Sequence, residues 1–152
     1  GVQTCALPIF NPIAFALGLG ASFVVSTAEW MGKHFLATLE KAVDHPGFSF
    51  VHIAQRCPKY NPDAWNHKES NWMTFMIHDT GIDPEPRLQE NARVVGHDPT
   101  DLEAAFEQAE DVPNRFGLFY VKEKLTYDGL MQRRLQDAVK KDRKQILDGF
   151  GI

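Results

Sequence analysis

The sequence predicts an α/β fold in which a parallel sheet is flanked by helices. Two observations carry this prediction. Helix-like and strand-like stretches alternate along the first part of the chain with short joints between them, which is typical of α/β units. The composition, 43% hydrophobic and 24% charged, is close to the average for globular proteins. A chain of 152 residues can bury a real core and has room for about one domain.

The first helix is predicted to start at Asn11 and Pro12. Asparagine can cap the free amides of a helix, and proline suits its first position. Gly18 and Gly20 end this helix. Residues 21–25 are apolar and partly β-branched, so they predict a buried strand.

Residues 33–44 return to a helical period and present one apolar face. His45-Pro46-Gly47 stops this helix, and residues 48–54 predict a second buried strand. Cys57 lies just beyond the carboxyl end of that strand. The order helix, strand, helix, strand favours a parallel sheet.

The middle of the chain, residues 58–96, is rich in proline and has little periodicity. It contains Trp65 and Trp72, and only residues 72–77 suggest a short strand or helical turn. A loop of this length without structure of its own is unusual. We therefore expect this segment to wrap around a partner or around its own core.

The last part of the chain predicts two helices and a strand between them. Thr100 to Glu103 fit a capping box ahead of a helix. Residues 116–121 predict a third strand, and residues 127–147 a long amphipathic helix. Basic residues cluster on that helix: Arg133, Arg134, Lys140, Lys141, Arg143 and Lys144. We interpret them as a solvated face near a favourable helix dipole, with a docking surface for an acidic partner as the less favoured alternative.

Charge and cysteine content exclude several classes of protein. The formal net charge is −4 and the pI about 5.8, so no basic footprint indicates nucleic-acid binding. No apolar run approaches the roughly 18 residues that a membrane-spanning helix needs. Two cysteines cannot build a disulfide framework, which favours a reducing cytoplasm.

Residues 1–9 are predicted to be an artefact. Their sequence, GVQTCALPI, matches one reading frame of a common short-read sequencing adapter. On this interpretation the natural sequence begins near Phe10, and Cys5 has no biological role.

No catalytic set of residues is complete in the sequence, and we assign no catalytic residue. Gly18 and Gly20 end a helix instead of opening one, which excludes a dinucleotide-binding fingerprint. Asp98 and Asp101 precede a helix, where carboxylates offset its dipole. The histidines are scattered without ligand spacing and are expected at the surface or in caps: His34, His45, His52, His67, His78 and His97.

Cys57 is the one candidate for special chemistry. It follows a strand at the sheet edge where ligands of open α/β folds gather. Arg56 and Lys59 would favour its thiolate, the form that binds metal or acts as a nucleophile. The residues alone nevertheless favour a buried, inert cysteine over a reactive or metal-binding one.

A series of short motifs gives the chain a family resemblance. They occur in the order NPIA (11–14), GLGASFV (18–24), KA (41–42), HPGFSFV (45–51), CPKYN (57–61), HDPTD (97–101) and GLFY (117–120). In this order they resemble the C-terminal half of the thiamine diphosphate-binding β subunit of 2-oxoacid:ferredoxin oxidoreductases. Val25-Ser26 and Pro58-Lys59 depart from the residues common in that family.

The resemblance implies a C-terminal part of a thiamine diphosphate-binding domain at residues 10–61. Residues 62–152 would be a wrapping C-terminal extension with a helix, a strand and a terminal amphipathic helix. It implies thiamine diphosphate, Mg²⁺ and a [4Fe–4S] cluster as cofactors of the whole subunit, with Cys57 as one cluster ligand. The implied reaction oxidatively decarboxylates a 2-oxoacid to acyl-CoA. An α subunit, ferredoxin, coenzyme A and the 2-oxoacid are the partners.

The motif that holds Mg²⁺ and the diphosphate in this family, Gly-Asp-Gly…Asn, is expected upstream of Asn11, as are the other three cluster cysteines. We therefore expect the isolated chain to bind neither cofactor tightly and to be inactive. Two alternatives remain open: an α/β docking module without catalysis, and a fragment of another thiamine enzyme such as an acetohydroxyacid synthase. Among substrates, 2-oxoglutarate is preferred to pyruvate because the tail resembles that of two-subunit members.

Overall fold

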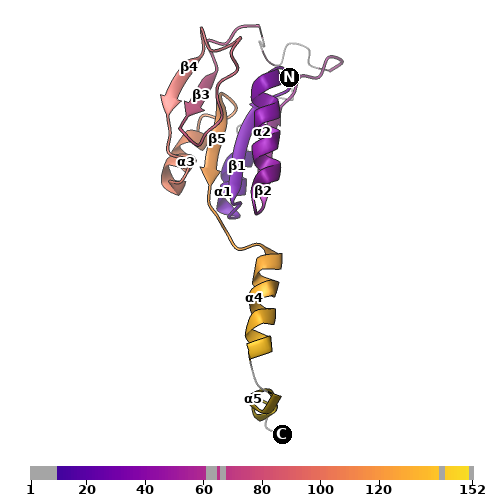
Figure 1. Cartoon of the computed structure of the whole chain (residues 1–152). Coiled ribbons are helices and arrows are strands. Elements are labelled where there is room, and N and C mark those ends of the chain that lie inside the picture. The colour runs from indigo at the N-terminus through magenta and orange to yellow at the C-terminus, as the bar shows by residue number, and fades with distance from the viewer. Residues whose placement is uncertain (1–9, 61–64, 66–67, 141–142, 151–152) are drawn as a thin grey trace.

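A five-stranded sheet forms the centre of the fold (Figure 1). The computed structural model describes residues 10–60, 65, 68–140 and 143–150, so the predicted adapter segment 1–9 lies outside the described residues. The elements are α1 (Pro12–Gly18), β1 (Phe23–Ala28), α2 (Gly32–Asp44), β2 (Ser49–Ala54), β3 (Thr74–Ile77), β4 (Arg93–Gly96), α3 (Leu102–Ala109), β5 (Arg115–Val121), α4 (Tyr127–Lys140) and α5 (Arg143–Asp148).

The strand order is β2-β1-β5-β3-β4, and the sheet is mixed. β1 runs parallel to β2, and β3 runs parallel to both β4 and β5. β5 is antiparallel to β1, with an irregular register between Val24 and Val25. The predicted α/β class is confirmed, and the antiparallel pair is an addition to the predicted parallel sheet. The direction of β5 relative to β1 is set by pairing between strands that are distant in the sequence, and local periodicity does not encode that pairing.

Helices cover both faces of the sheet. Ile13, Leu17 and Ala105 pack from α1 and α3 onto one face, where Val24 belongs to their cluster. Phe23 and Val25 belong to a different cluster, which includes Ala37 and Ala42 of α2. Neighbouring residues of a strand point to opposite faces, so this division places α2 across the sheet from α1 and α3.

The predicted boundaries in the first half of the chain agree closely with the structure. The Asn11 side chain accepts a hydrogen bond from the Ala14 amide at 3.0 Å, which confirms it as the cap of α1. Asn11 also donates to the Ala109 carbonyl at 2.7 Å and so joins α1 to α3.

The second half differs from the prediction in several details. Asp101 caps α3, accepting from the Glu103 and Ala104 amides; the predicted cap at Thr100 is wrong. β4 was not predicted, because its four residues lack a clear alternating pattern. β3, β4 and β5 join the same sheet as β1 and β2, so the extension does more than wrap around the sheet.

The predicted long terminal helix is described as α4 and α5, with residues 141–142 outside the described residues. Both helices project from one end of the sheet, away from its layers (Figure 1). No helix in the described part of the chain is long and apolar enough to cross a membrane.

Candidate functional site

The carboxyl ends of β1 and β2 form one edge of the sheet. The strands pair in register, so that Ala28 lies beside Ala54 where both strands end. The Glu29 amide donates to the Ala54 carbonyl at 3.0 Å and holds the following loops together. Ligands of open α/β sheets bind beyond such carboxyl ends.

Cys57 lies in the loop beyond β2, at the edge where the sequence placed it, and its side chain is half-buried. The charges next to it have partners of their own. The Arg56 Nε lies 2.6 Å from the Glu29 carboxylate, and the Lys59 ammonium lies 5.5 Å from the Tyr60 ring centre. The expected effect of Arg56 and Lys59 on the thiol therefore stays a prediction.

We tested whether the residues of this edge could hold an iron–sulfur cluster by themselves. Among the described residues, no three or more His, Cys, Asp or Glu side chains gather in a group that could hold a metal ion. A [4Fe–4S] cluster takes four protein ligands, usually cysteine thiolates. The role of Cys57 as one ligand of a cluster therefore stays a prediction.

Three tryptophans gather beside this edge. The rings of Trp65 and Trp72 are stacked with centres 5.6 Å apart, and Trp30 lies 6.2 Å from Trp65. The Trp65 indole donates to the Gln55 carbonyl at 3.3 Å, two residues before Cys57. The tryptophans pack on a buried cluster that contains Ala54 at the end of β2. Apolar surroundings of this kind restrict the access of water to a metal site.

A second group of polar residues lies where α2 begins. Met31, the N-cap residue of α2, makes no side-chain capping hydrogen bond, and Glu85 from a distant loop takes over that role. One Glu85 oxygen accepts from the Lys33 amide at 2.9 Å and from the His34 amide at 3.3 Å. Burial would raise the pKa of Glu85, but these hydrogen bonds and the nearby Arg87 outweigh it and lower the pKa.

His34 is buried at this point and is neutral at physiological pH. Its Nδ1 lies 2.8 Å from the Thr27 hydroxyl at the end of β1. Burial lowers the pKa of His34 from 6.5 to about 4, and the Glu85 carboxylate only partly opposes that effect. Its Nε2 has no hydrogen-bond partner among the described residues.

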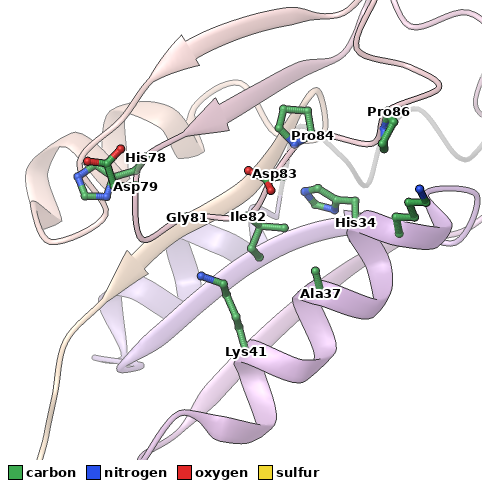
Figure 2. A pocket seen from close by; sticks show the side chains of 11 residues that line it. His34, Ala37, Lys41, His78, Asp79, Gly81, Ile82, Asp83, Pro84 and Pro86 are labelled. Carbon is green, nitrogen blue, oxygen red and sulfur yellow. The ribbon is translucent and has the colours of Figure 1, made fainter.

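A cleft of about 420 Å³ lies between α2 and the loop after β3 (Figure 2). His34 and Lys41 reach into it from α2, and the Lys41 ammonium donates to the Thr80 carbonyl at 2.8 Å. The lining carries both lysines and aspartates, and it contains no cysteine; it consists of Lys33, His34, Ala37, Lys41, His78, Asp79, Gly81, Ile82, Asp83, Pro84 and Pro86. Its mixed charge suits a small polar molecule but points to no reaction.

The expectation that the histidines lie at the surface or in caps is wrong for two of them. His34 and His97 are 1% and 6% exposed. The His97 Nε2 lies 2.7 Å from the Phe119 carbonyl, so it joins the loop after β4 to β5. His52 lies 3.0 Å from the Ser26 hydroxyl, and burial lowers its pKa. The partners of these histidines lie 22 to 51 positions away in the sequence: Ser26 for His52, Phe119 for His97 and Glu85 for the His34 amide. No local sequence pattern identifies such distant partners.

The curated proteins that resemble this chain include β subunits of 2-oxoacid:ferredoxin oxidoreductases. The protein from a Sulfolobus species is 30% identical over 115 residues, which covers 74% of this chain and 36% of the relative. The subunit from Aeropyrum pernix is 28% identical and covers 82% of this chain and 38% of the relative. The subunit from Saccharolobus solfataricus is 36% identical over 67 residues, 40% of this chain and 22% of the relative.

This chain therefore spans between about a fifth and two fifths of the length of these relatives. Among solved structures, a 2-oxoglutarate:ferredoxin oxidoreductase from Magnetococcus marinus, with 2-oxoglutarate, coenzyme A and succinyl-CoA bound, has a similar fold. The TM-score is 0.64 at 23% identity, over 91% of this chain and 44% of that one. No protein-family profile matches the sequence.

Proposed function

Because this chain belongs to the family of 2-oxoacid:ferredoxin oxidoreductase β subunits, we propose that it is the C-terminal part of such a subunit. The complete enzyme would oxidise and decarboxylate a 2-oxoacid, transfer the acyl group to coenzyme A and pass electrons to ferredoxin. In this proposal thiamine diphosphate with Mg²⁺ supplies the decarboxylation chemistry, and a [4Fe–4S] cluster takes up electrons. The remainder of the subunit would provide the residues that bind thiamine diphosphate.

The position of Cys57 is the observation that carries the proposal. Cys57 follows β2 at the carboxyl edge of the sheet, and its side chain is half-buried. We assign to it the role of one cluster ligand, with the other three thiolates supplied from outside this chain. A thiolate at this place needs a fixed loop, and the hydrogen bond from Glu29 to Ala54 fixes the point from which the loop starts.

Two neighbouring features would support that ligand. The ion pair between Arg56 and Glu29 joins the loop of Cys57 to the end of β1. The Trp30, Trp65 and Trp72 cluster would keep water from one side of the site, which affects the reduction potential of a cluster. Both are roles of positioning and shielding; neither group is a metal ligand.

The names of the relatives favour this function over the two alternatives, a docking module without catalysis and an acetohydroxyacid synthase. An α subunit, ferredoxin, coenzyme A and a 2-oxoacid are the proposed partners of the complete enzyme. 2-Oxoglutarate stays the preferred substrate over pyruvate, and the cytoplasm stays the predicted location.

The test uses the complete subunit, purified without oxygen together with its partner subunit. Cys57→Ala should remove the visible absorption of the cluster and reduce the iron content from about four atoms per subunit to below about one. Tyr60→Phe is the matched control, since it changes an exposed ring in the same loop and removes no candidate ligand. It should keep both the absorption and the iron.

A Cys57→Ala enzyme that keeps its iron, its absorption and its rate of ferredoxin reduction would overturn the assignment. The chain itself gives a separate test. Anaerobic reconstitution of these 152 residues should yield no stable four-iron chromophore, because the described residues gather no complete set of ligands. A stable cluster on the chain alone would contradict the role of Cys57 as one donor among four.

A further inference from the structure

The two walls of the cleft between α2 and the loop after β3 are held together at two points by residues of this chain (Figure 2). At one point Glu85 accepts from the Lys33 and His34 amides at 2.9 Å and 3.3 Å. At the other the Lys41 ammonium donates to the Thr80 carbonyl at 2.8 Å. The cleft is therefore formed without a ligand, and its volume of about 420 Å³ is typical of small-molecule sites.

His34 lines this cleft with a ring nitrogen that has no partner. The side chain is 1% exposed, and its Nε2 makes no hydrogen bond with any described residue. Figure 2 shows the ring pointing from α2 toward the segment that carries Asp83. A buried polar group without a partner costs about 1–3 kcal/mol. A molecule in the cleft that pairs with Nε2 would remove that cost.

The Thr27 hydroxyl decides which ring nitrogen of His34 carries the proton. This hydroxyl is buried, and its partner among the described residues is Nδ1 of His34 at 2.8 Å. The hydroxyl satisfies its own proton by donating it to Nδ1. Thr38 supplies no competing proton, because its hydroxyl donates to the His34 carbonyl at 2.7 Å. The neutral ring then carries its proton on Nε2, which makes Nε2 a donor without an acceptor.

The charged side chains around this donor balance one another. Lys33 and Lys41 lie on the α2 wall, and Asp79 and Asp83 lie on the facing segment. His34 itself is neutral, since burial lowers its pKa to about 4. A complementary molecule therefore carries both signs of charge and no net charge, whereas a plain anion would meet the two aspartates and a plain cation the two lysines.

The exposure of these charges favours a dissolved molecule over a segment of protein as the occupant. All four lysine and aspartate side chains are exposed. Charged side chains are depleted from the buried centre of protein interfaces, because an interface would have to remove them from water. A small polar molecule can neutralise them while the mouth of the cleft stays hydrated.

We propose that this cleft binds a small zwitterion of the amino-acid type. Its carboxylate accepts the proton of His34 Nε2 and faces the lysines, and its ammonium group faces Asp83. The cleft is lined by no cysteine, so this site is separate from that of Cys57. The inference does not depend on the proposed enzymatic function.

The first test measures the binding of each common amino acid to the 152-residue chain by saturation-transfer NMR, followed by calorimetry. At least one should bind with a dissociation constant of about 1 mM or lower. Its analogue without the amino group and its analogue without the carboxylate should each bind at least about tenfold more weakly, because each leaves one wall without its counter-charge. No binding, or equal binding of either analogue, would overturn the proposal.

The second test uses variants of the cleft. Asp83→Asn should weaken binding at least about tenfold, while Asp44→Asn, an exposed position on α2 outside the lining, should leave it unchanged. His34→Asn should weaken it by a similar factor, because the shorter amide does not reach the position of Nε2. Circular dichroism checks that each variant is folded. Since Asp83 is exposed, unchanged binding by Asp83→Asn counts against the proposal even where His34→Asn fails to fold.

The ring of His34 gives a direct readout. Nitrogen NMR of the labelled chain should show this ring as the Nε2–H tautomer, and the signal of that proton should shift when the bound amino acid is added. A ring protonated on Nδ1, or a signal that the ligand does not change, would contradict the assigned contact.

The complete subunit decides whether another part of the protein occupies the cleft. It should bind the same amino acid as the chain with a dissociation constant equal to within about threefold. Binding by the chain but not by the complete subunit would overturn the proposal, because a segment of the remainder would then fill the site.

Discussion

The buried histidine at the start of α2 makes the stability of this fold depend on pH. His34 is 1% exposed, and its pKa falls from 6.5 to about 4. In the unfolded chain the same side chain takes up a proton as the pH drops below about 6.5. Folding therefore becomes less favourable between these two values, and the stabilisation is fully present only above the higher one.

The size of the effect follows from the two pKa values of His34. The interval from 6.5 down to about 4 corresponds to about 3 kcal/mol, of which about 2 kcal/mol is lost between about pH 7.5 and pH 5. His52, whose pKa is also lowered by burial, adds a smaller loss in the same direction. Glu85 contributes only at lower pH, because its pKa lies below 4.5 and its stabilising charge is lost as the pH falls through that folded value.

The assay is urea unfolding of the chain at several pH values, compared with His34→Asn. Asparagine can keep the contact with the Thr27 hydroxyl, but it does not titrate. The variant should lose most of the pH dependence of its unfolding free energy. His78→Asn, which replaces an exposed ring, should keep it. Equal pH dependence in the wild type and His34→Asn would refute the reasoning.

Three further predictions concern stability measured by urea or thermal unfolding. Gly117 has a φ of +118°, and an added Cβ would lie 2.9 Å from the Met76 carbonyl; Gly117→Ala should therefore cost about 2 kcal/mol or more, while Gly96→Ala, with open space around it, should have little effect. Glu85→Gln removes the charge that caps α2 and should cost about 1 kcal/mol, with an unchanged midpoint counting against that role. Asn11→Ala removes the cap of α1 and the bond to α3 and should cost about 1–2 kcal/mol; a loss below the error of the measurement would contradict the assignment of that cap.

The sequence indicated the elements whose formation depends on near neighbours. Asn11 and Pro12 mark the start of α1 because capping needs only the next few amides. α2 and β2 follow from the spacing of their apolar residues and from the proline and glycine between them. The same local reading placed Cys57 just beyond β2, and the family motifs gave it a proposed role as a cluster ligand.

Contacts between distant residues required the tertiary structure. Glu85 caps a helix that begins more than fifty residues earlier, and nothing near Glu85 in the sequence signals that partner. His34 reads as an ordinary helical histidine until Thr27 and Phe75 enclose it. The capping box at Thr100 shows the same limit at short range, since the backbone there selects Asp101 as the cap.

The sequence by itself determined the α/β class, the family and the position of Cys57, because these depend on periodicity, on local hydrogen bonds and on motifs read in order. Only the tertiary structure decided that β5 runs antiparallel to β1, that His34 is neutral and that Leu130 and Leu135 of α4 are exposed. Strand direction, desolvation and exposure all depend on contacts between residues that are distant in the sequence. These contacts are determined by the whole fold, so no single segment of the sequence predicts them.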